Sequence, residues 1–175
     1  MPRYVTFDID AIHNSVFGSV LTKWEERCGS YFAPTWNSDL HFLDFDSGLI
    51  PRMTLVQVDG QPGVGIYRFW GTGIKTYGNC DQTNSRVGAQ ETPEMEEDFG
   101  AQYQQVVETG IPRCYATQIR LKDWDSHFKF EASLRLPFTS DGEIVDWILC
   151  VDHYADNWTN LIRALGVADV PQPFS

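Results

Sequence analysis

The stretch "HFKFEASLRLPFTSDGEIVDWILCVDHY", residues 127–154, decides the fold because it predicts two strands joined by a tight turn at Asp141-Gly142. In its first half, apolar and polar side chains alternate, which indicates a strand with one buried face and one polar face. The apolar members are Phe128, Phe130, Ala132, Leu134 and Leu136, and the polar members are Lys129, Glu131, Ser133 and Arg135.

The second half of this stretch has apolar side chains on both faces. Trp147, Leu149 and Val151 alternate with Ile144, Ile148 and Cys150. A strand of this kind belongs in the middle of a sheet that is covered on both sides.

Three further strands are expected outside this hairpin, at residues 52–60, 63–74 and 112–123, from their β-branched and aromatic content and the turn residues around them. Helical spacing of apolar residues predicts helices at 15–29, 92–110 and 156–166. We therefore expect an α+β fold with a five-stranded antiparallel sheet, helices on one side of it, and flanking N- and C-terminal helices.

The central helix has the clearest end signals. Thr92 is a typical N-cap, Pro93 suits the first helical position, and Gly110 is a typical stop. Its apolar stripe includes Phe99 and Tyr103.

The length of 175 residues fits one domain, 1–175, with a core at about 50–154. A formal net charge of −11 argues against nucleic acid and anionic membranes as partners. No apolar run reaches the length of a membrane span, so we expect a cytoplasmic protein. Neither the cysteine nor the histidine spacing predicts a metal site.

Several segments together resemble the PAS fold, in particular a bacterial family of small, single-domain PAS-like proteins. They are "LTKWEERCGSYFAPTW" (21–36), "LIPRMTLVQVD" (49–59), "YRFWGTGI" (67–74), "VVETGIP" (106–112) and "LRLPFTSDGEIVDWIL" (134–149). The resemblance implies a small cavity between the sheet and the helices that follow the second strand, able to hold a metabolite, haem or flavin, or to stay empty. It implies a stand-alone sensory or small-ligand-binding module that acts through a partner or a homo-oligomer.

The candidate ligand-binding residues are one arginine and five aromatic residues near the expected cavity. Arg68 lies in an otherwise apolar strand, so its charge is either an anchor for an anionic ligand or part of an internal salt bridge with Glu131, Asp146 or Asp152. The aromatic residues could stack a flat ligand or simply fill the core: Trp70, Tyr77, Tyr103, Tyr115 and Trp147.

Flavin and haem are both disfavoured, and the identity of any cofactor stays open. Cys80 takes the place of the photoreactive cysteine of light-sensing PAS relatives, but Asp81 and Asn84 stand where those relatives have Arg and Gln. A carboxylate beside a phosphate site repels the cofactor and raises the thiol pKa. No histidine lies in the helix that would supply a haem ligand.

The amphipathic helix that contains Trp24 is expected to form a homodimer interface. No catalytic constellation is found, and Asp152-His153-Tyr154 is interpreted as an exposed strand end. Two other functions remain open: a structural interaction domain with a filled core, and a small cystatin-like α+β enzyme.

Overall fold

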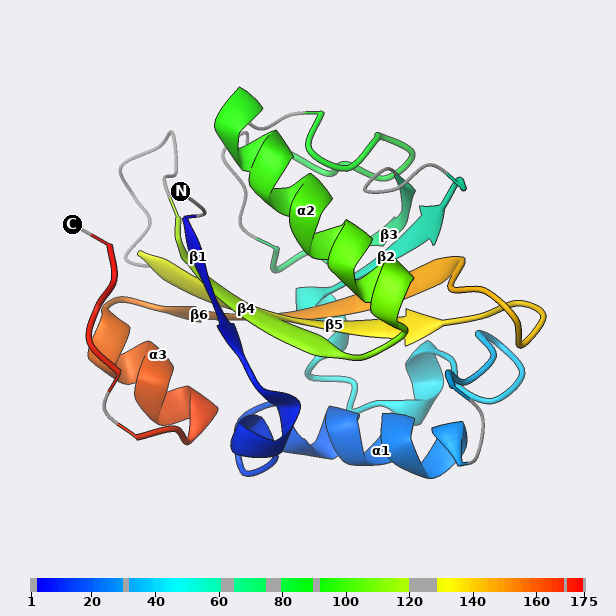
Figure 1. The fold of residues 1–175 in the computed structure, drawn as a ribbon, viewed down its shortest axis with the longest axis horizontal. Helices are drawn as coiled ribbons and strands as arrows, with labels where there is room; N and C mark the ends of the chain where they lie inside the picture. Colours follow the sequence, from blue (N-terminus) through cyan, green and yellow to red (C-terminus); the bar gives the residue numbers. More distant parts are fainter. Residues whose placement is uncertain are drawn as a thin grey trace.

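A six-stranded antiparallel sheet forms the centre of the protein in a computed structural model that describes residues 3–29, 32–60, 65–74, 80–89, 92–119, 129–168 and 170–174 (Figure 1). The strands are β1 (Tyr4–Phe7), β2 (Met53–Val58), β3 (Gly65–Trp70), β4 (Arg113–Gln118), β5 (Phe130–Phe138) and β6 (Trp147–Ala155). Their spatial order is β1-β4-β5-β6-β2-β3. The α+β class is as expected, but the sheet has six strands because residues 4–7 add an edge strand beside β4.

Strand β6 lies in the middle of the sheet, paired with β5 on one side and with β2 on the other. Seven of its nine residues are buried, and all nine residues of β5 are buried. The prediction of a central strand covered on both sides is therefore confirmed.

Helices cover both faces of the sheet, which corrects the expectation that they gather on one side (Figure 1). One face packs against α2 (Pro93–Thr109), and the other packs against α1 (Gly18–Cys28) and α3 (Trp158–Leu165). The physical reason is the apolar character of both faces of β6, since each face needs its own covering layer. Three short 3-10 helices complete the described elements: η1 (Ile9–Ile12), η2 (Phe42–Asp44) and η3 (Ile50–Arg52).

The ends of α2 follow the sequence signals. The Thr92 hydroxyl accepts a hydrogen bond from the backbone N–H of Met95, Pro93 is the first helical residue, and Gly110 ends the helix with a positive φ of 63°. Glycine tolerates this left-handed conformation better than other residues do. These caps fix where α2 starts and stops over the sheet.

The apolar stripe of α1 faces the chain's own sheet, which corrects the expectation that it serves a second copy. Trp24 is only 6% exposed, and its indole N–H donates a 2.8 Å hydrogen bond to the carbonyl of Pro137 at the end of β5. Val20 and Leu21 are buried in the same core. Among the described residues, no helix combines the length and apolarity needed to cross a membrane.

Candidate functional site

The face of the sheet beneath α2 contains a group of buried polar side chains. Alternate residues of a strand point to the same face, so Glu131, Ser133 and Arg135 of β5 share this side. The register places Asp152 of β6 opposite Ser133, and Cys150 opposite Arg135. All five residues are buried, so the polar face of β5 is an interior surface.

Arg135 has the most unusual surroundings of this group. It is 3% exposed, and its Nη2 donates a hydrogen bond to the side-chain carbonyl of Gln102 on α2. Its guanidinium carbon lies 3.8 Å from the ring centre of Tyr103 and 5.4 Å from that of Tyr115, within cation–π distance. Its Nε and Nη1 have no hydrogen-bond partner among the described residues.

No carboxylate among the described residues forms an ion pair with Arg135. An arginine guanidinium stays protonated at physiological pH. A buried arginine commonly has a carboxylate beside it, since leaving a buried charge uncompensated is costly. Here a neutral amide and aromatic faces surround the cation instead.

Asp152 is the second buried group with a polar atom that has no hydrogen-bond partner among the described residues. It is 7% exposed, its Oδ2 accepts a 3.2 Å hydrogen bond from the Tyr154 hydroxyl, and its Oδ1 has no partner within the described part of the chain. Burial raises the pKa of Asp152 to about 6, although the hydroxyl of Ser133 and the charge of Arg135 act in the opposite direction. The interpretation of residues 152–154 as an exposed strand end is therefore wrong at Asp152, because the strand continues to Ala155 beneath cover.

A cavity of about 40 Å³ lies between α2 and this polar face. Its polar wall includes Arg135, Asp152, Glu131, Ser133 and Thr54. The volume suffices for roughly one to three water molecules. Pockets for drug-sized ligands measure about 300–1,000 Å³, so a flavin or a haem does not fit this space as it stands.

A second cavity, of about 240 Å³, adjoins the first and shares Met95, Phe99 and Thr117 with it. Gln102, whose side chain holds Arg135, also lines the second cavity. The smaller cavity has the polar wall, and the larger cavity lies next to it beside α2.

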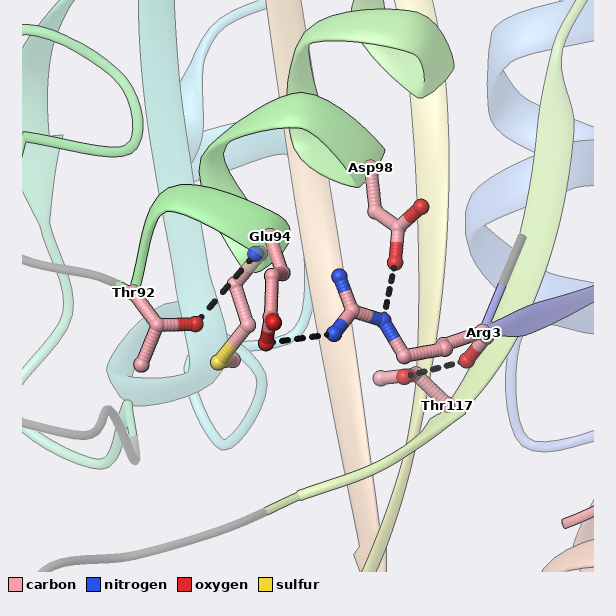
Figure 2. A network of polar contacts seen from close by, with 6 residues as sticks. Arg3, Thr92, Glu94, Asp98 and Thr117 are labelled. Carbon is pink, nitrogen blue, oxygen red and sulfur yellow. Dashed lines mark hydrogen bonds and ion pairs between the residues drawn. The ribbon is translucent and has the colours of Figure 1, made fainter. Parts of the chain in front are cut away.

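Arg3 connects three elements at the wall of the second cavity (Figure 2). Its Nη1 lies 2.8 Å from Oε2 of Glu94, and its Nε lies 3.1 Å from Oδ2 of Asp98, both on α2. Its backbone carbonyl accepts a 3.0 Å hydrogen bond from the hydroxyl of Thr117 on β4. The start of β1 is thus tied to the N-terminal part of α2.

Of the aromatic residues expected at the site, Trp70 and Tyr103 line the smaller cavity. Tyr115 lies beside Arg135, and its hydroxyl donates to the side chain of Gln105 at 2.7 Å. Trp147 lies on the opposite face of the sheet with the α1 core, and its indole N–H donates to Ser140. Tyr77 lies outside the described residues.

Arg68 is exposed on the edge strand β3 and does not line either cavity. Its Nε donates to Gln57 at 2.9 Å, and its Nη1 donates to Asn84 at 3.2 Å. These neutral partners replace the expected salt bridge, because an edge position leaves the guanidinium in contact with water.

The thiol at the cavity belongs to Cys150, which sequence reasoning did not select. Cys150 is buried, and its sulfur is hydrogen bonded to the Tyr103 hydroxyl at 3.2 Å. Burial raises the pKa of Cys150, so the thiol is protonated at neutral pH. Cys80, by contrast, is exposed. No group of three or more His, Cys, Asp or Glu residues in the described ranges could hold a metal ion.

Comparison with known proteins found no matching family model, curated protein or solved structure. The buried Arg135 and Asp152, with the cavities beside them, form the candidate site of the described residues.

Proposed function

We propose that this chain is a PAS-like module that binds a small polar molecule beneath α2 and passes the binding event to a partner or to a second copy. One observation supports it above all others: among the described residues, two nitrogen atoms of Arg135 and one oxygen of Asp152, both lining the small cavity, have no hydrogen-bond partner. A buried polar group without a partner costs about 1–3 kcal/mol, so atoms of this kind favour a site that something polar fills.

The arrangement of elements supports the PAS-like part of the proposal. The hairpin β2–β3 precedes α2, the three strands β4, β5 and β6 follow it, and the cavity lies between α2 and the sheet. This is where the resemblance places a ligand. Strand β1 and the helices on the opposite face are additions to the expected arrangement.

Helix α2 is the element best placed to transmit binding. Gln102 on α2 accepts a hydrogen bond from the guanidinium of Arg135, so a ligand that binds Arg135 alters the strength of this hydrogen bond. The same helix is tied at its other end to β1 through Arg3. We propose that a shift of α2 is the signal that a cytoplasmic partner or a second copy recognises.

A homo-oligomer would need a surface other than the stripe of α1, because Trp24 and its neighbours are buried against the sheet. Light scattering over a range of protein concentrations, with and without ligand, tests this part of the proposal. If the protein stays monomeric under all conditions, signalling through a second copy is excluded and only signalling through a different partner protein is left.

The alternative of an interaction domain with a filled core is favoured by the small volume of the inner cavity, about 40 Å³. Water could occupy such a space and pair with the orphaned atoms. Native mass spectrometry of gently purified protein, followed by thermal-shift screening with small polar metabolites, separates the two functions. A retained small molecule, or a stabilising one whose effect disappears in Arg135→Met but not in Arg68→Met, supports ligand binding. Failure of every compound to stabilise the protein contradicts it.

A further inference from the structure

The unpaired atoms of the inner cavity form a complementary pair of opposite charge. Within the described part of the chain, Arg135 offers two unpaired nitrogen donors, Nε and Nη1, and Asp152 offers one carboxylate oxygen. Glu131 also lines the cavity but has interactions of its own, so it is not part of this pair. Tyr103 and Cys150 are neutral at physiological pH because burial raises their pKa values. The charged groups of the cavity that have atoms without a hydrogen-bond partner are therefore one cation, Arg135, and one anion, Asp152.

Arg135 and Asp152 lie on the same face of neighbouring strands without pairing directly. Asp152 is directly opposite Ser133, and Arg135 is two residues further along β5 on the same face. The backbone positions of diagonal neighbours of this kind lie about 7–8 Å apart across an antiparallel pair. Arg135 and Asp152 form no direct ion pair, and each turns an unpaired polar atom to the interior. A short molecule with an acceptor at one end and a donor at the other would satisfy both.

We infer that the inner cavity binds the head group of a small α-amino acid, with its carboxylate on Arg135 and its ammonium on Asp152. This inference rests on the proposed function and names its ligand class. A zwitterion meets each buried charge with the opposite charge through charge-assisted hydrogen bonds. A simple carboxylate would bring a second anion to Asp152, and a simple amine would bring a second cation to Arg135. Either of these ligands would leave one buried charge without an oppositely charged partner.

The cavity volumes limit how a short amino acid can fit. The inner space of about 40 Å³ has room for only about one to three water-sized groups, so the rest of the molecule must lie outside it. Met95, Phe99 and Thr117 line both this space and the neighbouring cavity of about 240 Å³, so we place the remainder of the amino acid on that side. In that cavity, Arg3 is already paired with Glu94 and Asp98, so an uncharged side chain suits it best.

The test compares whole zwitterions with their halves. Glycine, L-alanine and L-serine are titrated into the full chain by calorimetry, beside acetate, methylammonium and acetamide. Amide resonances of Ser133 and Cys150 report whether binding occurs at this site. We expect the amino acids to bind at least about tenfold more tightly than either half, because each half leaves one buried charge unmet.

Two variants and a control locate the charges. Arg135→Met and Asp152→Asn should each weaken amino-acid binding at least about tenfold, whereas Arg68→Met should leave it unchanged. Asp152→Asn keeps the shape of the side chain, so it remains informative if Arg135→Met does not fold.

The outcomes separate the inference from the proposed function. If acetate or acetamide binds as tightly as the amino acids and shifts the same amides, the ligand class is wrong but a ligand site beneath α2 stands. If an amino acid binds equally well to wild type and to Asp152→Asn, the inferred contact with the ammonium is wrong. If no probe of any class shifts these amides, both the inference and the proposed function fail.

Discussion

Replacing Asp152 by asparagine is expected to stabilise the protein at neutral pH and to have almost no effect in acid. Burial raises the pKa of this carboxyl from its ordinary 3.8 to about 6, so the folded protein holds a proton that the unfolded chain has already released. Folding stability therefore falls as the pH rises from about 4 to 6. Each pKa unit corresponds to about 1.36 kcal/mol, so ionised Asp152 costs about 3 kcal/mol above pH 6. Asparagine keeps the shape but cannot ionise.

Urea unfolding followed by tryptophan fluorescence measures this difference directly. The free energy of unfolding of Asp152→Asn should exceed that of wild type by almost nothing near pH 3.5, by about 2 kcal/mol near pH 5.5 and by about 3 kcal/mol near pH 7.5. Asp156→Asn is the matched control, because hydrogen bonds from Asn160 and neighbouring groups lower the pKa of the exposed Asp156. That replacement should destabilise at neutral pH and have little effect in acid. A folded Asp152→Asn variant that is less stable than wild type near pH 7.5 would refute the reasoning.

Three further changes test the packing around the site. Trp24→Phe leaves the buried carbonyl of Pro137 without its donor and should lower the free energy of unfolding by about 1–3 kcal/mol; a smaller loss in urea titrations would show that water replaces the bond. Gly71→Ala places a Cβ 2.3 Å from the carbonyl oxygen of Pro51 and should lower the melting temperature, whereas an unchanged value would mean that the backbone moves aside at no cost. Arg3→Ala removes one exposed and one part-buried ion pair and should cost about 1 kcal/mol, but hydrogen exchange should speed up in the first turn of α2; equal exchange would show that β1 does not hold the helix.

The central hairpin and the ends of α2 were predictable because their signals are local. Alternation along β5 identifies the strand, and Thr92 with Pro93 marks the start of the helix regardless of what surrounds them. Strand β1 was missed because four residues are too few for a periodic pattern, and it depends on pairing with β4 over 100 residues away.

The sequence pattern points to Arg68, which the structure places on an exposed edge strand away from both cavities, and it does not point to the buried Arg135. Alternation shows that Arg135 and Glu131 share a face of β5, but it cannot show what covers that face. A usable signal existed: β6 was expected to be covered on both sides, and its neighbour β5 lies beneath the same cover. Combining these two predictions would have made Arg135 a buried charge in need of a partner.

Strand order explains why the two arginines differ in what they can do. Arg68 is on the edge strand β3, where water and neutral side chains satisfy it. Arg135 is on β5, next to the central strand and beneath α2, where it is 3% exposed and its Nε and Nη1 have no hydrogen-bond partner among the described residues. A purely structural arginine at such a position would gain most from a carboxylate in direct contact. Asp152 is close enough for its pKa to respond to the charge of Arg135 yet forms no ion pair with it, and this separation favours a bound molecule between the two over a salt bridge that only holds the fold together.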